Sequence, residues 1–279
     1  MSHKKLILIN EYQLCKLLNI SIATAKIKTL CVDSTYIRPQ LHCIIYGALG
    51  SGKSNILYEV GEVLKTSPII DFSRATLFGT IDKNTGMLNT PAIWQCRNSC
   101  LLIDEFTFIA NSPHSVNMLQ GLLPILENPR FIKKVGLRVN DVSEKDKDLF
   151  LRVKDGTIDC KTRFVMIIDT MMDLRSRTSQ WIDALVSRCL VIPHYPSLDD
   201  LKNLVRGGTF YEFKNYSVDS DIKISKKNYN KIIEIVEANV KKPQAYLRSV
   251  GDCCRVFAVL KKHDENIYKL IVRMKEQLL

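Results

Sequence analysis

Hydrophobic and polar positions follow two alternating rhythms over the middle of the chain. Short continuous apolar runs, typical of strands covered on both faces, are separated by stretches with amphipathic helical spacing, such as SNILYEVGEVLKT. The apolar runs are HCIIYG, SPIIDFS, SCLLIDEF, RFVMIIDT and RCLVIPHY. Strands that alternate with helices predict an α/β fold with a parallel sheet, which we assign to residues 41–196.

The N-terminal flank of this α/β domain is predicted to be helical. Leu14, Leu17 and Leu18 recur at helical spacing, and a second short helix is expected over residues 22–30. Because two helices bury no core of their own, we expect this N-terminal helical segment, residues 1–40, to pack on the edge of the main domain. A DNA-reading helix-turn-helix is the alternative interpretation.

After residue 196 the strand signals mostly fade. The spacing of apolar residues predicts helices near 198–206, 225–240, 243–262 and 265–279. The sequence therefore predicts a small C-terminal helical domain over residues 197–279.

The composition of the 279-residue chain narrows the class of protein. Its 46% hydrophobic and 25% charged residues are ordinary for a globular protein and exclude a disordered chain or a fibre. The nine cysteines are odd in number and scattered, without CxxC pairs or a histidine cluster, which argues against a disulfide framework and a zinc site. No apolar run approaches the roughly 18 residues of a membrane span. We therefore expect a cytoplasmic protein in a reducing compartment, without a membrane partner.

The charge balance suggests an anionic partner. Forty Lys and Arg residues face 29 Asp and Glu residues, which gives a net charge of +11. Between Lys223 and Arg248, basic residues outnumber acidic ones by seven to two. Basic surfaces attract nucleic acid but also serve solubility, so the charge alone does not establish a partner.

The clearest chemical signal is the segment GALGSGKS, which matches the pattern GxxxxGK[ST]. It follows the apolar run CIIY and opens a predicted helix, which is the context that a phosphate-binding P-loop requires. Lys53 is expected at the β- and γ-phosphates of ATP, and Ser54 at Mg²⁺. The residues predicted to bind the nucleotide are Gly47, Gly50, Ser51, Gly52, Lys53, Ser54 and Asn55.

The run SCLLIDEF supplies two carboxylates at the carboxyl end of a buried strand, where open α/β sheets bind ligands. Asp104 is placed to hold the metal, directly or through water, and Glu105 to polarise an attacking water. An ion pair at a strand end is the alternative for either residue. Two adjacent carboxylates favour hydrolysis over transfer to another substrate.

Together these segments resemble the AAA+ ATPases, whose Walker A and Walker B motifs correspond to GALGSGKS and LLIDEF. The resemblance covers about residues 47–260. It implies a parallel-sheet P-loop AAA+ domain with a small C-terminal helical lid. It also implies hydrolysis of ATP with Mg²⁺, and a homo-oligomeric ring or filament with a hexamer as the expected form.

The resemblance also implies roles for three residues outside the two motifs. At the end of RFVMIIDT, Thr170 corresponds to the sensor 1 residue, with Asp169 as the competing choice. Arg188 in DALVSRC resembles the arginine finger that reaches the nucleotide of a neighbouring subunit, and capping of the preceding helix is its alternative. Arg248 resembles the sensor 2 residue of a lid helix, with Arg255 as the second choice and a solvated surface position as the alternative.

An insertion before the RFVMIIDT strand is predicted to form a β-hairpin near residues 133–154. VGLRVND and LFLRVKD alternate apolar and polar positions and are joined by VSEKDK. The placement resembles the pre-sensor 1 hairpin of minichromosome-maintenance-type and superfamily 3 helicases, which contacts nucleic acid. The implied contact residues are Arg138, Lys145, Lys147 and Arg152. Four acidic residues at the tip, Asp141, Glu144, Asp146 and Asp148, oppose their charge.

Three functions fit these features. The first is a nucleic-acid ATPase of the helicase, replication-initiator or loader type. The second is a protein-remodelling ATPase similar to the MoxR group, which also carries hairpin insertions and would act on a protein partner. The third is a non-oligomeric P-loop kinase or switch. The expected arginine finger and helical lid favour the first two.

Overall fold

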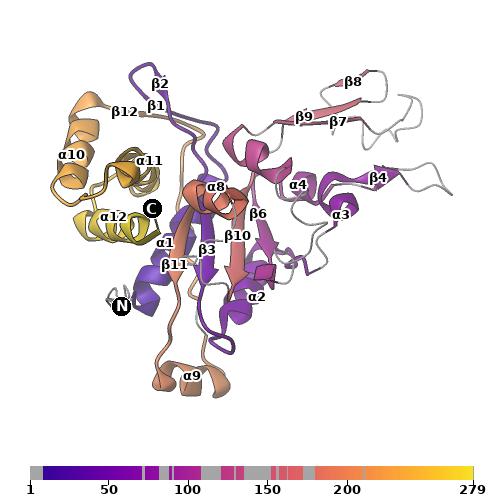
Figure 1. Ribbon diagram of the computed structural model, residues 1–279, viewed down its shortest axis with the longest axis horizontal. Coiled ribbons are helices and arrows are strands. Elements are labelled where there is room, and N and C mark those ends of the chain that lie inside the picture. The colour runs from indigo at the N-terminus through magenta and orange to yellow at the C-terminus, as the bar shows by residue number, and fades with distance from the viewer. Residues whose placement is uncertain are drawn as a thin grey trace.

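The computed structural model shows a mixed α/β chain built around an all-parallel sheet (Figure 1). It describes residues 9–70, 73–81, 88–89, 91–107, 121–128, 130–134, 152–154, 157–161, 163–171, 180–209 and 211–278. Within these residues no helix is long and apolar enough to cross a membrane.

The central sheet has four strands in the order β11-β3-β10-β6, and every neighbouring pair is parallel. The strands are β3 (His42–Tyr46), β6 (Cys100–Ile103), β10 (Val165–Thr170) and β11 (Cys189–Pro193). All of their residues are buried, as the continuous apolar runs predicted. In the described part of the predicted strand SPIIDFS, residues 67–70 and 73, Ile69 forms a single parallel bridge to Ile103 at the β6 edge.

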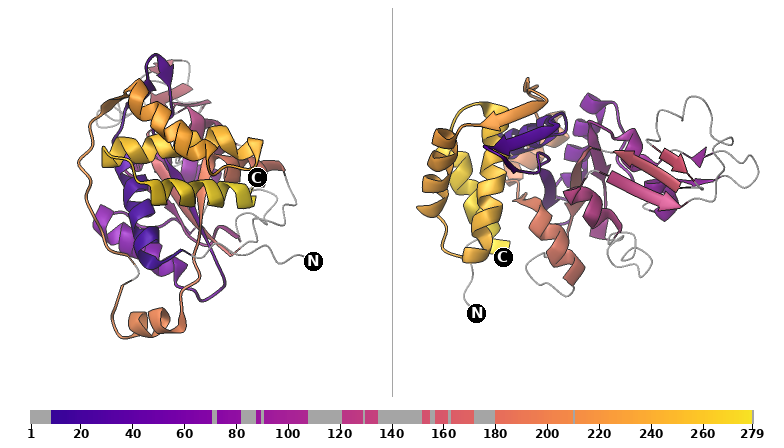
Figure 2. Two further views of the ribbon diagram at one scale, coloured as in Figure 1. Left: turned by 90° about the vertical axis from the view of Figure 1, so that its left-hand side faces the viewer. Right: turned by 90° about the horizontal axis from the view of Figure 1, so that it is seen from above.

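Helices cover both faces of this sheet. Successive strand residues point to opposite faces, so the continuous apolar runs place side chains on both faces that need cover. Cys43 and Ile45 pack into one core with helices α1, α2, α10, α11 and α12, whereas Ile44 and Tyr46 pack into a second core with α3, α4, α8 and helical residues 121–127. The bounds of the helices are α1 (Glu11–Thr24), α2 (Lys53–Leu64), α3 (Arg74–Phe78), α4 (Ala92–Gln95), α8 (Gln180–Arg188), α10 (Lys226–Glu237), α11 (Pro243–Leu260) and α12 (Glu265–Leu278). The result is a three-layer α/β/α arrangement (Figure 2).

The described part of the N-terminal segment, residues 9–40, contains one helix and a strand pair, so the predicted second helix over 22–30 and the helix-turn-helix alternative are wrong. Helix α1 begins after a capping box between Asn10 and Gln13 and runs to Thr24. The chain then forms β1 (Thr29–Val32) and β2 (Thr35–Tyr36). Strand β1 pairs in parallel with β12 (Asp221–Ile224), about 190 residues away, and this long-range pairing overrides the local helical pattern.

The C-terminal helices were predicted correctly, but they occupy two places. Helices α10, α11 and α12 share one continuous core with α1 and the sheet. Helix α9 (Leu198–Val205) instead lies beyond the carboxyl ends of the strands, at the bottom of Figure 1. The chain leaves β11, forms α9, and returns along the molecule to β12 and the other helices (Figure 2, left).

The described residues of the insertion form antiparallel strands, whereas the first strand of the predicted hairpin, VGLRVND, and the joining segment VSEKDK lie outside the described residues. Strands β7 (Arg130–Lys134), β9 (Thr157–Lys161) and β8 (Arg152–Lys154) pair in the order β7-β9-β8. The prediction ended the hairpin near 154 and missed β9, which pairs with both other strands. Arg152 lies in β8, whereas Arg138, Lys145 and Lys147 lie outside the described residues. This sheet projects from the molecule beside the pair β4 (Thr80–Ile81) and β5 (Leu88–Asn89), at the right of Figure 1.

Candidate functional site

A crevice forms where the connections of the central sheet change direction. After β3 the chain runs through α2 to Ile69, beyond β6, whereas after β10 it runs through α8 to β11 on the other side of β3. The carboxyl ends of β3 and β10 are therefore the topological switch point, where open α/β sheets bind ligands. The two ends meet directly, because the Gly47 N–H donates to the Thr170 carbonyl over 3.2 Å.

The glycine-rich loop, residues 47–52, follows β3 at this point. A Cβ on Gly47 would overlap the carbonyl oxygen of His194, so only glycine fits there. Gly52 has a φ of 82° and precedes the first residue of α2 without a side-chain cap on that helix. The N–H groups of the first turn of α2 have no partner within the helix, and such a helix N-terminus binds anions.

Lys53 places a cation beside these N–H groups. Its side chain is buried, and Nζ donates to the Ala48 carbonyl over 2.8 Å and to Ser51 Oγ over 3.4 Å. Burial lowers the pKa of Lys53, whereas the charges of Asp169 and Asp104 act in the opposite direction. A phosphate group beside Nζ would compensate this buried positive charge.

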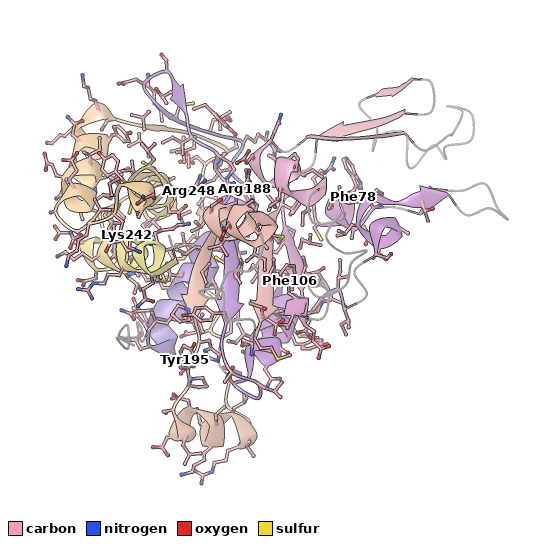
Figure 3. All side chains as sticks on the ribbon, in the orientation of Figure 1. Phe78, Phe106, Arg188, Tyr195, Lys242 and Arg248 are labelled. Carbon is pink, nitrogen blue, oxygen red and sulfur yellow. The ribbon has the colours of Figure 1, made fainter. Side chains whose placement is uncertain are left out.

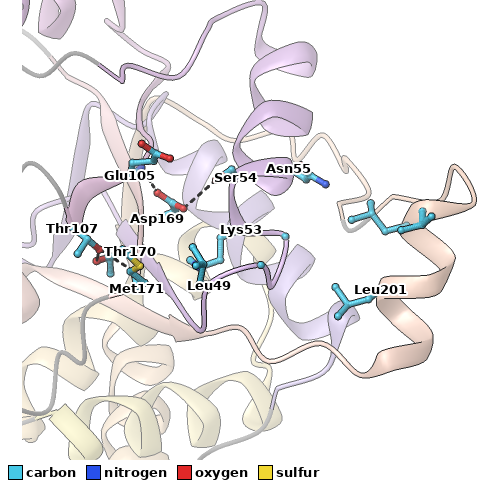
Figure 4. A pocket seen from close by; sticks show the side chains of 14 residues that line it. Leu49, Lys53, Ser54, Asn55, Glu105, Thr107, Asp169, Thr170, Met171 and Leu201 are labelled. Carbon is cyan, nitrogen blue, oxygen red and sulfur yellow. Dashed lines mark hydrogen bonds between the residues drawn. The ribbon is translucent and has the colours of Figure 1, made fainter.

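Two buried carboxylates, Asp104 and Asp169, lie close to Ser54. Figure 4 shows Asp169 beside Ser54. Ser54 Oγ donates to Asp104 Oδ1 over 2.9 Å and lies 3.5 Å from Asp169 Oδ2. The backbone N–H of Glu105 donates to both carboxylates, over 2.9 Å to Asp104 and 2.6 Å to Asp169. Burial and the neighbouring charge of Asp104 raise the pKa of Asp169 to about 7.

This group of oxygens suits a magnesium ion. Mg²⁺ usually takes one or two carboxylates, completing its shell with phosphate oxygens and water, and Ser54 with Asp104 provides such a partial shell. Burial and the charge of Asp104 raise the pKa of Asp169, and a cation beside the two carboxylates would offset both effects. Across the described residues, no group of three or more His, Cys, Asp or Glu side chains is placed to hold a metal, so an all-protein cage is not formed here.

Glu105 has an unusual backbone conformation. Its φ of 53° lies in the left-handed region, which residues with side chains rarely adopt and which recurs at functional sites. This conformation turns its N–H toward the two carboxylates, while the exposed side chain lines the crevice. The carboxylate of Glu105 is therefore accessible to a water molecule in the crevice.

The two sensor 1 candidates occupy different positions in the crevice. Asp169 lies beside Ser54, whereas Thr170 Oγ1 lies 2.9 Å from Thr107 Oγ1. Thr107 Oγ1 also accepts the Met171 N–H over 3.0 Å, which fixes the end of β10. Thr107 was missed in the sequence, although its position three residues after Asp104 puts it at the same strand end.

The crevice encloses about 500 Å³ and has one apolar wall. That wall is made by Leu49 and by Leu201, Leu204 and Val205 of α9, and both Leu49 and Val205 are more than four-fifths exposed. The other lining residues are Gly50, Gly52, Lys53, Ser54, Asn55, Glu105, Thr107, Asp169, Thr170 and Met171. Such a crevice suits a ligand with a charged phosphate end and a flat apolar end. The sequence predicted helix α9 but not its place at this site.

Three predicted site residues support the crevice from behind. Asp104 is buried under Ser54, and Gly47 holds the junction of the strands. The carbonyl of Ser51 lies 2.8 Å from His194 Nε2, a contact that ties the loop to the residue after β11.

Arg188 and Arg248 lie at the opposite end of the sheet, where β11 begins (Figure 3). Arg188 pairs with Glu127 over 2.8 Å and donates to the Ala184 carbonyl in the last turn of α8, as its helix-capping alternative predicted. Arg248 donates to the Ser187 carbonyl. Neither Arg188 nor Arg248 lines the crevice.

Arg255, the second choice for sensor 2, also lies away from the crevice and pairs with the buried Asp252. Sequence reasoning placed these arginines by their order along the chain, whereas their position depends on how α11 packs against α8 and α12.

No protein-family model matches the sequence, and no curated protein is significantly similar to it.

The raised pKa of Asp169 makes the stability of the chain depend on pH. Since the pKa of this carboxyl is higher in the folded chain than in the unfolded one, the folded chain retains the proton between about pH 4 and pH 7. The free energy of unfolding therefore decreases as pH rises through this window. Asp169→Asn removes the charge but keeps an oxygen that can accept the Glu105 N–H. We expect the free energy of unfolding of this variant, relative to that of wild type, to increase by at least about 1 kcal/mol as pH rises from 5 to 7.5.

Urea unfolding in the absence of divalent cations measures this difference. Asp33→Asn is the matched control, because Asp33 is exposed and has a positive φ that Asn also tolerates. If the free energy of unfolding has the same pH dependence in wild type and in Asp169→Asn, the pKa of Asp169 is not raised in the folded chain.

Proposed function

We propose that the chain is an ATP hydrolase of the AAA+ type that binds ATP and Mg²⁺ in the crevice at the ends of β3 and β10. The observation that carries this proposal is the joint placement of three features at one switch point: an uncapped helix N-terminus, the buried Lys53, and Ser54 bonded to Asp104. Each feature alone has structural explanations, but together they match the needs of a triphosphate with its cation.

In this proposal the glycine-rich loop and Lys53 bind the β- and γ-phosphates, and Ser54 and Asp104 hold the cation. When bound, Mg²⁺ would neutralise charge on the phosphate oxygens. Glu105 accepts a proton from the attacking water, because its carboxylate is exposed to the crevice beside the fixed Asp104. The Thr107–Thr170 pair orients a hydroxyl toward the same space. The apolar wall of Leu49 and α9 receives the adenine base.

We further propose that the chain acts as a homo-oligomer on nucleic acid. Arg188 lies at the far end of the sheet from the crevice, so it can act on a nucleotide only in a neighbouring copy, which implies head-to-tail assembly. The net charge of +11 and the projecting β7-β9-β8 sheet, which includes Arg152, support a nucleic-acid partner. The eight cysteines whose side chains the structure describes form no disulfide with one another, which suits a reducing cytoplasmic compartment.

ATP binding and hydrolysis should separate in two variants. Lys53→Ala removes a cation at the phosphates and should weaken ATP binding at least about 10-fold. Glu105→Gln should bind ATP as wild type does while its turnover number decreases about 10²–10⁴-fold, because only the proton acceptor is lost. Calorimetry and a phosphate-release assay measure the two effects.

Glu62→Gln is the matched control for the second variant, because Glu62 is exposed on α2 away from the crevice. Weak ATP binding by Glu105→Gln, with a normal result for the control, would assign Glu105 a structural role instead.

The partner and the assembly can be tested in one hydrolysis assay. Single-stranded DNA should stimulate hydrolysis, and the stimulation should decrease as salt rises, because phosphate contacts release counterions. Arg188→Ala mixed with wild type should lower the rate by more than its share of the chains, because each variant copy inactivates a neighbour's site. A rate that is unchanged by DNA would favour a protein partner, as in the MoxR-like alternative. A strictly proportional mixing curve would refute the shared site.

A further inference from the structure

A second cavity, of about 260 Å³, lies at the amino end of the sheet, on the side opposite the glycine-rich loop. It is bounded by α8, α11, α12 and the segment that precedes β3. Among the described residues that line it, the cationic ones are Arg38, Arg188, Arg248, Arg255 and Lys275, and the carboxylates are Glu127 and Asp252. We call it the arginine cavity. Five positive charges against two negative ones leave a surplus of three.

The two carboxylates are already engaged. Asp252 is almost fully buried and pairs with both Arg255 and Lys275, the latter over 3.0 Å. Glu127 is half-exposed and pairs with Arg188 over 2.8 Å. The surplus charge is therefore carried mainly by the remaining two arginines.

Arg38 and Arg248 have only carbonyl partners among the described residues. Arg38 donates to the carbonyls of Leu126 over 2.9 Å and of Arg188 over 3.0 Å, and Arg248 donates to the carbonyl of Ser187. A carbonyl satisfies a donor but does not neutralise a charge. Burial and the charge of Arg255 lower the pKa of Arg38 to about 10, which reflects the cost of holding these cations together.

Two guanidinium donors in this cavity are unsatisfied. The Nε atoms of Arg38 and Arg188 are buried and have no hydrogen-bond partner within the described part of the chain. A buried donor without a partner costs free energy, and such groups in native structures call for an explanation. An oxyanion in the cavity would neutralise the surplus charge of the residues that line it.

We propose that the arginine cavity binds a free oligophosphate, with pyrophosphate as the simplest example. Guanidinium groups form paired hydrogen bonds with phosphate oxygens, and the planar forks of several arginines suit a group that carries more than one negative charge. The volume of the cavity suits a small anion.

Calorimetric titration of the full chain with sodium pyrophosphate, without divalent cations, tests this proposal. The titration uses Lys53→Ala, because the glycine-rich loop is expected to bind the same anion. We expect this variant to retain one pyrophosphate site per chain. Adding Arg248→Ala should weaken that site at least about 10-fold, since a charge-assisted hydrogen bond is lost. Arg248→Lys, which keeps the charge but not the fork, should give an intermediate loss.

Arg273→Ala is the matched control, because Arg273 is exposed on α12 and does not line the cavity. Arg248 is also exposed, so its replacement should leave the fold intact, and circular dichroism checks this. Absence of pyrophosphate binding in Lys53→Ala would overturn the proposal, as would equal affinities of the Arg248→Ala and Arg273→Ala variants. An Arg248-dependent site for a single-stranded oligonucleotide that pyrophosphate does not displace would also overturn it.

The outcome is independent of the proposed ATPase function. If Lys53→Ala binds ATP as tightly as wild type, the crevice proposal fails while pyrophosphate binding in the arginine cavity remains testable. If Lys53→Ala loses ATP binding but shows no pyrophosphate site, only the arginine-cavity proposal fails.

Discussion

The candidate site depends on the close approach of three strand ends at Gly47. The Gly47 N–H bonds to the Thr170 carbonyl at the end of β10, and the backbone of His194, just after β11, occupies the space of any side chain at position 47. The His194 ring then contacts the carbonyl of Ser51 within the loop. This junction holds the start of α2 over β10 and β6, so that Ser54 reaches Asp104. A larger residue at position 47 would move the loop and break that contact.

A parallel sheet gives its two ends different chemistry. All carboxyl ends meet at one edge, where Asp104, Asp169 and Glu105 gather beside a helix N-terminus. The arginines gather near the amino end of β11, beside the carboxyl end of α8, where the helix dipole favours cations. Separated in this way, the acidic site can hold a cation with its phosphates and the basic cavity can hold a free anion. In the proposed assembly, this separation would let the arginines of one copy meet a nucleotide only in another copy.

Local patterns predicted the sheet and much of the crevice, whereas features made by long-range contacts were missed. The buried strands and the residues Lys53, Ser54 and Asp104 follow from continuous apolar runs and one spacing motif, which depend on neighbours in the sequence. The pairing of β1 with β12 joins segments about 190 residues apart, so no local signal announced it. The contribution of α9 to the crevice, and the position of Arg248 away from it, depend on how helices pack after the sheet has formed.

The central claim is that the Asp104–Asp169 pair and the glycine-rich loop together form a site for ATP and its cation. Calorimetric titration of wild type with a non-hydrolysable ATP analogue and Mg²⁺, at pH 7 in two buffers of different ionisation enthalpy, tests it most directly. With the pKa of Asp169 near 7, binding should release about half a proton per nucleotide, and Asp169→Asn should bind without this release. Binding with the same proton count in both proteins, or no binding to wild type, would contradict the account.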